Sequence, residues 1–464
     1  MNIPLNGRIA IIDDKIDQAL PLINVLAQRR CPYSYYSGEM NFLPKEDEVT
    51  NDIRILFLDI NLIDDKVHPD KELKSKLIPV LSRVISKENY PYVLIYWSRN
   101  EKEYRKLVED IFENDLNDRK PIAFLSQNKL SFFELDSTKT ADFDKHVKEL
   151  LDEINKTLGT YKAYNHLVGW ENQVHYSADK TLQEIFNIRE NWSDNANYLI
   201  NKLGESYAGR RIFKSQTPAG KIRSSFQAFN NVFYDTLEYS INNSTYNEDT
   251  DLEYNKDLAN KDNIYTINKK LLISNENTVM EYSGSVTEDK NSKSDKAFED
   301  LLNNVFNRSK IGADIIKDDS NKGKNNKELQ KLIDKESSNK RKEIRESWRK
   351  IYFVVTPLCD FVQSKSYNVR VVKGILIKTD HLNFIDQKSE AVFISPQFKF
   401  DGDKYVIVLN FRYFFTSTGG KGIKGLKTLF RVRQQMLSEV QSKLARHVSR
   451  QGVLFLEEYQ DSIF

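Results

Sequence analysis

Two short runs of branched apolar residues, each ending in aspartate, constrain the first third of the chain most strongly. "RIAIIDD" occupies residues 8–14 and "IRILFLD" occupies residues 53–59. Amphipathic helical patterns separate these runs from two later ones, "YVLIYWS" at 92–98 and "IAFLS" at 122–126. Strands that are apolar on both faces and alternate with helices are typical of a parallel sheet covered on both sides. With "PYSYYSG" as a weaker fifth strand, the sequence predicts a five-stranded parallel α/β domain.

The 464 residues exceed one ordinary domain core, so several domains are expected. Composition changes along the chain predict four parts. These are the α/β domain at 1–157, a helical region at 158–240, a polar and partly flexible insert of helices and loops at 241–345, and a β-rich α+β domain with antiparallel strands at 346–464.

Apolar residues at helical spacing predict that one long helix ends the chain, over residues 426–452, with Gly452 at its C-terminal cap. They are Leu429, Val432, Met436, Leu437, Val440, Leu444 and Val448. In the region 158–240 we interpret the scattered aromatic residues as helix-packing residues. They are Tyr161, Tyr164, Trp170, Trp192, Phe226, Phe229 and Phe233.

Composition excludes several classes of protein. The two cysteines, Cys31 and Cys359, rule out a disulfide scaffold and a cysteine-based zinc site and fit a reducing compartment. The N-terminus lacks the apolar segment of a signal peptide, and no run of about 18 apolar residues occurs. We therefore expect a cytoplasmic protein with no membrane partner.

The aspartates at the strand ends are the candidate functional residues. Asp13 and Asp14 follow the first strand, and Asp59 follows a later one after an interval that fits one helix, one strand and a second helix. Neighbouring parallel strands end at the same edge of a sheet, so the three carboxylates are expected to converge. Such a cluster repels itself without a cation and invites a hard divalent ion, most simply Mg²⁺. The alternative is that these aspartates only cap the helices that follow.

Two polar residues follow the later strands, Ser98 after "YVLIYW" and Lys129 after "IAFLSQN". Together with the acidic pair in "IIDDK" and the aspartate in "LFLDINL", this pattern resembles the receiver domain of response regulators. The resemblance implies a flavodoxin-like fold in which Asp13, Asp14 and Asp59 hold Mg²⁺ and Asp59 accepts a phosphoryl group. It also implies that Ser98 hydrogen-bonds the phosphoryl oxygens and that Lys129 neutralises them. An ordinary turn serine and a lysine without this role are the alternatives.

Two features depart from the receiver pattern. The interval from Asp59 to Ser98 is longer than usual, with the extra residues in "IDDKVHPDKELKSK". The lysine is also displaced, because residues 126–128 separate Lys129 from the apolar run, whereas the family has Lys-Pro directly after it. Both departures bear on the phosphoryl chemistry rather than on the fold.

The segments "VVTPLCDFVQS" (354–364) and "QSKLARHVSRQG" (441–452) make the whole chain similar to large bacterial proteins with an N-terminal receiver domain. This resemblance implies a histidine-kinase-like ATPase or another protein as partner, in a phage-defence or stress system. The expected function is signalling, in which phosphorylation of Asp59 controls a C-terminal output module. Enzymatic activity beyond self-directed phosphoryl transfer and autodephosphorylation is not expected.

Two other functions stay open. The receiver fold could be an interaction platform with no phosphate chemistry, which the displaced lysine favours. The C-terminal part could instead act on nucleic acid, because residues 340–464 hold 22 Lys/Arg and 12 Asp/Glu, an excess of 22 − 12 = +10.

The basic residues of the predicted terminal helix are either phosphate contacts or a solvated helical face. They are Arg431, Arg433, Lys443, Arg446 and Arg450. The acids available to such an effector are Asp360, Asp380, Asp401 and Asp403, without a recognisable catalytic arrangement. Cys359 we interpret as a buried structural cysteine.

Overall fold

The computed structural model of the chain describes residues 8–45, 52–63, 68–99, 101–134, 138–244, 252, 260, 262–274, 282–362 and 367–449. The chain divides into two compact units, Met1–Leu199 with Phe226–Glu253, and Ile200–Ser225 with Tyr254–Phe464. The two units do not test the four parts predicted from composition, so those parts stay a prediction. None of the helices described is long and apolar enough to cross a membrane.

A five-stranded parallel sheet forms the centre of the first unit. Its strands are β1 (Ile9–Ile12), β2 (Tyr33–Tyr36), β3 (Ile55–Leu58), β4 (Val93–Ser98) and β5 (Ala123–Asn128). Their order is β2-β1-β3-β4-β5, and every neighbouring pair is parallel. The predicted parallel sheet is confirmed, and its strand order is compatible with a flavodoxin-like fold.

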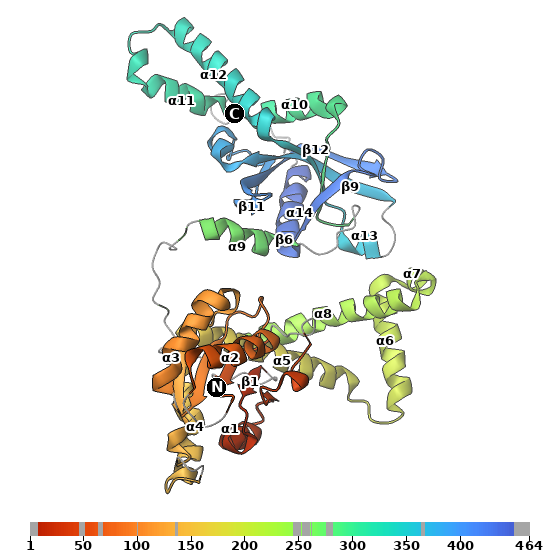
Figure 1. The fold of residues 1–464 in the computed structure, drawn as a ribbon. Helices are drawn as coiled ribbons and strands as arrows, with labels where there is room; N and C mark the ends of the chain where they lie inside the picture. Colours follow the sequence, from red (N-terminus) through yellow and green to blue (C-terminus); the bar gives the residue numbers. More distant parts are fainter. Residues whose placement is uncertain are drawn as a thin grey trace. The chain divides into compact units, whose positions relative to one another are not determined.

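Helices cover both faces of this sheet (Figure 1). They are α1 (Ile16–Gln28), α2 (Asp70–Val84), α3 (Glu101–Asp110), which continues into the π-helical η2 (Ile111–Asp115), and α4 (Phe143–Leu158). On one face α1 and α4 pack with Ile9 and Ile11, and on the other α2 and α3 pack with Ala10 and Ile12. Because both faces are buried, the strands read as unbroken apolar runs.

The connection between β2 and β3 differs from expectation. The sequence spacing predicts a second α-helix there, but the described residues hold only the short 3-10 helix η1 (Met40–Phe42), and residues 46–51 lie outside the description. Gly38, with a φ of +76°, and Pro44 flank this turn. Both residues disfavour a continuous α-helix, which explains the difference.

Helices also dominate the region 158–240, as predicted. They are α5 (Lys162–Phe186), α6 (Trp192–Ala208), α7 (Arg210–Ser215) and α8 (Pro218–Asn242). The interpretation of the aromatic residues as packing residues is correct for Tyr164, which is 3% exposed. Phe226 is more than half exposed but packs on Phe229, with ring centroids 6.2 Å apart. The interpretation is wrong for Trp170 and Trp192, which are each more than half exposed.

An ion-pair cluster fixes α5 to the first sheet. Glu171 of α5 accepts hydrogen bonds of 3.1 Å from Nε and Nη2 of Arg54, which lies just before β3. Its Oε1 also lies 3.1 Å from Nη1 of Arg8, just before β1. The Tyr164 hydroxyl donates to the Arg54 carbonyl at 2.5 Å. The cluster therefore ties α5 to the ends of β1 and β3 that lie opposite the strand-terminal aspartates.

An antiparallel sheet of eight strands forms the centre of the second unit. The strands are β6 (Ile273–Ser274), β7 (Ser285–Glu288), β8 (Arg349–Val354), β9 (Asn368–Lys378), β10 (Val392–Ile394), β11 (Phe398–Phe400), β12 (Asp403–Thr418) and β13 (Lys427–Val432). Their order is β10-β12-β9-β8-β7-β13-β6, with β11 paired to β12. The predicted antiparallel strands are confirmed. The strands β6 and β7 are a correction, since the polar region 241–345 predicts only helices and loops.

Helices lie on both faces of the second sheet. The helices described in the Tyr254–Phe464 part of this unit are α9 (Asp262–Leu272), α10 (Asp295–Val305), α11 (Arg308–Lys317), α12 (Asn326–Ser347), α13 (Leu358–Val362) and α14 (Gln434–Val448). On one face α14 buries Met436, Leu437, Val440 and Leu444. On the other face α10 buries Phe298, Leu301, Leu302 and Val305.

The predicted long terminal helix is wrong in its first part. Residues Lys427–Val432 form the strand β13, and α14 begins only at Gln434. Phe430 and Val432 are buried with the half-exposed Arg431 between them, and this period of two is a strand pattern. The predicted cap Gly452 lies outside the described residues.

Candidate functional site

Strand register brings the predicted aspartates together. Asp13 directly follows β1 and Asp59 directly follows β3, and the last residues of these strands, Ile12 and Leu58, are paired. The Asp59 amide donates to the Ile12 carbonyl at 2.8 Å. One carboxylate oxygen from each of Asp13, Asp14 and Asp59 lies within 4.8 Å of the others. The predicted convergence at one edge of the sheet is therefore present.

Lys129 lies among these carboxylates. The strand β5 runs to Asn128, so residues 126–128 belong to the strand and Lys129 directly follows it. Its Nζ lies 2.6 Å from Asp59 Oδ2 and 2.7 Å from Asp13 Oδ2. The first contact is a hydrogen bond, and the second is an ion pair whose angles fall outside those of a hydrogen bond. The lysine is displaced along the sequence but lies at the acidic cluster in space.

Burial sets the electrostatics of the cluster. It raises the pKa of Asp13 to about 7 against the opposing pull of Lys129, and the Asp59 carboxylate adds to the rise. Burial and Asp59 likewise raise the pKa of Asp14. Burial depresses the pKa of Lys129, but the carboxylates of Asp59 and Asp13 outweigh it and hold that pKa above its ordinary value. Lys129 is therefore a permanent cation at neutral pH.

The cluster fits a divalent cation by charge and by ligand type. Asp13, Asp14 and Asp59 with Lys129 carry a formal charge of −3 + 1 = −2 when all four are ionised. Carboxylate oxygens are the protein ligands that Mg²⁺ prefers. These three aspartates are the residues that would hold such an ion. Burial is the main cause of the raised pKa values of Asp13 and Asp14, and repulsion from Asp59 adds to both, so a cation bound there would favour the ionised carboxylates.

Ser98 lies at the same edge of the sheet. It is the last residue of β4, is 1% exposed, and pairs with Asn128, the residue before Lys129. The structure thus brings Asp13, Asp59 and Lys129 into direct contact and places Ser98 on the neighbouring strand end. The functional roles of all these residues stay predictions.

Sequence reasoning misses two residues of this site. The Gln18 side chain accepts a hydrogen bond from Lys129 Nζ at 3.3 Å, and its carbonyl accepts one from Trp97 Nε1 at 3.3 Å. The Tyr35 hydroxyl donates to the Asp13 carbonyl at 2.6 Å. Gln18 could have been found, because it is a polar residue on the otherwise apolar, buried face of α1.

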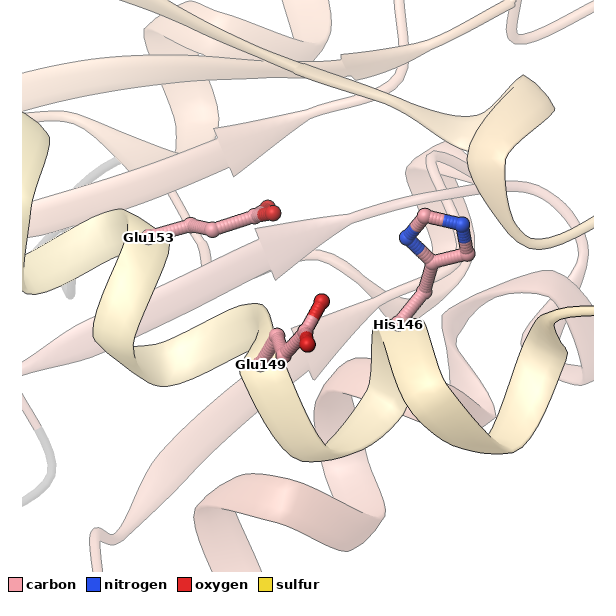
Figure 2. Close-up of side chains that lie close together, drawn as sticks. All are labelled: His146, Glu149 and Glu153. Carbon is pink, nitrogen blue, oxygen red and sulfur yellow. The ribbon is translucent and has the colours of Figure 1, made fainter.

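A second cluster of possible ligands lies on α4. Figure 2 shows His146, Glu149 and Glu153 along one side of this helix, and one ligand atom of each lies within 4.8 Å of the others. Gln127 of β5 donates to Glu153 at 3.1 Å. Both glutamates are exposed to solvent, which screens their charges without an ion. We regard this cluster as a solvated helical face.

Three of the four acids proposed for a C-terminal effector lie in separate ion pairs. Asp401 lies 2.7 Å from Arg349, Asp403 lies 3.0 Å from Lys378, and Asp360 lies 3.9 Å from Arg370. Asp380 is the second residue of the 3-10 helix η8 (Thr379–Phe384). Neither cluster of possible metal ligands in the described part of the chain includes any of these four aspartates.

The basic residues predicted on one helix are divided between elements. Arg431 lies on β13, Arg433 precedes α14, Lys443 and Arg446 lie on α14, and Arg450 lies outside the described residues.

The interpretation of Cys359 as buried is wrong, since it is exposed on the short helix α13. The chain is buried through residue 356, and Pro357 and Leu358 are half-buried, so Cys359 lies just beyond the buried segment that follows β8.

No family model, no curated protein and no solved structure matches the chain. The fold and site therefore define a parallel α/β unit with a lysine-bridged acidic cluster at the carboxyl edge of its sheet.

Proposed function

We propose that the first unit is a receiver-like phosphoacceptor domain in which Asp59 accepts a phosphoryl group in the presence of Mg²⁺. The observation that carries this proposal is the contact of Lys129 with both Asp13 and Asp59 at the carboxyl edge of the parallel sheet. The strand order is a further support, because ligands of open α/β sheets bind outside the carboxyl ends of their strands.

Each side chain has a defined part in this proposal. An Asp59 oxygen attacks phosphorus and forms a new P–O bond, while the bond between phosphorus and the donor breaks and its electron pair leaves with the donor group. A bound Mg²⁺ supplies charge neutralisation at the phosphoryl oxygens. Asp13 and Asp14 hold that ion with Asp59, Lys129 neutralises the phosphoryl charge, and Ser98 donates a hydrogen bond to it.

The signal would pass from this site to the rest of the chain. Phosphorylation adds negative charge at a buried cluster, which changes the balance of contacts that Lys129 now makes. The resemblance found in the sequence supports a histidine-kinase-like ATPase or another protein as partner, in the cytoplasm and in a phage-defence or stress system.

Phosphotransfer from a small donor tests the proposal. The full chain is incubated with acetyl phosphate and Mg²⁺, and the intact mass is measured. We expect a phosphoryl adduct that disappears with Asp59→Asn, with omission of Mg²⁺ or with EDTA. Asp17→Asn is the matched control, because Asp17 is an exposed aspartate in the first turn of α1, near the site, and should leave the adduct unchanged.

A phosphorylation-independent interaction platform is the second candidate. The observation that favours it is that the Lys129 ammonium already contacts Asp13 and Asp59 at 2.7 and 2.6 Å, which makes the cluster self-contained. In that case no adduct forms on a folded wild-type chain, and Asp59→Asn changes stability only.

A further inference from the structure

A bulge in the second sheet opens an aromatic cup. Between the pairs Leu409–Gly374 and Phe414–Val372, the single residue Lys373 of β9 faces residues 410–413 of β12. Bulges of this kind redirect side chains and are frequent beside functional sites. A cavity of about 390 Å³ lies here, and we call its lining the aromatic cup: Tyr352, Lys373, Tyr413, Phe414, Phe415 and Gly422.

The backbone around the bulge is built for this shape. A Cβ atom on Gly374 would lie 2.5 Å from Leu409 Cδ2 and 2.6 Å from the Val408 carbonyl oxygen, so only glycine allows the two strands to approach this closely. Asn410, at the start of the bulge, is 0% exposed, and its amide nitrogen has no hydrogen-bond partner among the described residues. Asn410 pairs with Val392, which belongs to the core on the cup's side of the sheet. Asn410 does not itself line the cup, so this donor shows only that the start of the bulge holds a buried polar group without a partner among the described residues.

The rings on the cup's side of the sheet are held in fixed orientations, with Tyr352 buried and Tyr413 and Phe415 partly exposed. Tyr352 and Phe415 pack edge to face, with centroids 6.0 Å apart and planes at 80°. Hydrogen bonds fix the two tyrosines, since the Tyr352 hydroxyl donates to Asp289 and the Tyr413 hydroxyl accepts from Asn304 Nδ2 at 2.8 Å. Tyr413 and Phe415 are half-buried and pack with the core on the cup's side of the sheet, whereas the Phe414 side chain packs with the core of the opposite face. A rigid aromatic surface of this kind suits stacking by a flat ring of a ligand.

The surroundings of the cup are basic. Residues 404–438 contain seven Lys or Arg residues and no Asp or Glu. Lys373 lies in the cup, with its Nζ 5.9 Å from the Phe415 centroid. The glycine-rich loop "TGGKGIKG" at 418–425 contributes Gly422 to the lining, and Lys421 and Lys424 on either side of it are exposed. An anion beside the flat ring therefore meets cations from two segments.

We propose that the aromatic cup and the glycine-rich loop bind a nucleotide, with its base against the rings of the cup and its phosphate beside Lys421 and Lys424. The ligand is a nucleotide unit, either free or within a single strand of nucleic acid. An acidic peptide would use the lysines but would leave the ring faces unused. This proposal concerns the second unit and does not depend on the phosphoacceptor proposal.

Fluorescence anisotropy of the full chain with labelled oligothymidylate and oligouridylate tests the proposal, and calorimetry with UMP forms the second arm. Tyr413→Leu should weaken binding about tenfold, because stacking of one base contributes on that order. Tyr413→Phe keeps the ring and should retain binding. Lys421→Gln with Lys424→Gln should weaken binding and lower the salt slope by about 1.4, at about 0.7 per phosphate contact on a single strand.

A second lysine pair serves as the matched control. Lys331→Gln with Lys335→Gln removes the same charge from exposed positions on α12 and should leave binding unchanged.

Comparable affinity for UMP and the oligonucleotides identifies a free nucleotide as the ligand, and selective oligonucleotide binding identifies a strand. Absence of saturable binding to every probe overturns the proposal. Binding that Tyr413→Leu leaves unchanged also overturns it. If circular dichroism shows that Tyr413→Leu does not fold, Phe415→Leu makes the same test.

Discussion

The ammonium nitrogen of Lys129 lies 2.6 Å from the Asp59 carboxylate, although 70 residues separate the two in sequence. Both residues are buried, and they follow β5 and β3, which lie on either side of β4. The contact therefore joins strand ends across the carboxyl edge of the sheet. It makes the lysine part of the acidic site, so the consequences of removing it can be predicted.

Lys129→Met should destabilise the metal-free protein by about 3–5 kcal/mol, because removing one partner leaves buried carboxylates without a countercharge. Mg²⁺ at millimolar concentration should restore much of this loss, since a divalent ion can neutralise the cluster and binds only the folded chain. Urea unfolding with and without Mg²⁺ measures both effects. Lys148→Met, at an exposed position on α4, is the control and should change stability by less than about 0.5 kcal/mol. Equal stability of Lys129→Met and the wild type would contradict the assigned contact.

Ser98→Ala should leave the phosphoryl adduct but weaken the response to it. A hydrogen bond to a charged group contributes about 1.5–3 kcal/mol, so beryllofluoride with Mg²⁺ should be bound at least tenfold more weakly. Trp97 is the neighbouring residue and its indole donates to Gln18, which in turn accepts from Lys129. A titration that follows tryptophan fluorescence can therefore report the change, with Trp97→Phe as the control for the signal. An unchanged affinity would remove Ser98 from the site.

Glu171→Gln should loosen α5 from the first sheet. The carboxylate is 16% exposed and faces the guanidinium groups of Arg54 and Arg8, which would lose this counterion. We expect a loss of about 1–3 kcal/mol and faster hydrogen exchange along α5. Glu184→Gln on the same helix removes a more exposed ion pair, 3.7 Å from Lys180, and should be nearly neutral. Equal exchange rates in the two variants would show that the cluster does not anchor the helix.

His381 should make the second unit less stable in acid. Burial lowers its pKa, with Glu343 and Asp380 opposing and Lys340 and Lys378 assisting that shift. The unfolded chain then takes up a proton near the ordinary histidine pKa of 6.5 before the folded chain does, so stability falls as pH drops through that value. His381→Gln should reduce this acid-side slope in unfolding experiments. A slope identical to that of the wild type would show that His381 does not contribute to it.

The strand-end aspartates could be placed from sequence because parallel strands have a simple geometry. "IAII" and "ILFL" are unbroken apolar runs, and the residues that follow them must lie at one edge of the sheet. The position of Lys129 was harder to predict. Residues 126–128 alternate between half-buried and exposed, as expected on the edge strand β5, so the apolar run ends before the strand does. Tertiary pairing, not local composition, defines the end of that strand.

The second unit was less predictable because its signals are ambiguous or weak. Leu429 and Val432 are spaced as in a helix, and it is the pairing of β13 with β7 and β6 that shows that they lie on a strand. In β7 the polar residues Ser285 and Thr287 are fully buried, so a strand at the centre of the sheet has a composition typical of a loop. Such short polar strands are stabilised by their neighbours, which a single sequence does not show.

The most direct measurement of the central claim is the position of the transferred phosphoryl group. The chain is incubated with acetyl phosphate and Mg²⁺ and reduced with borohydride, which converts an aspartyl phosphate to homoserine, and its peptides are then mapped by mass spectrometry. We predict homoserine at residue 59, dependent on Mg²⁺ and absent from Asp59→Asn. Modification at any other aspartate, or none on a folded chain, would contradict the assignment of Asp59 as the phosphoacceptor.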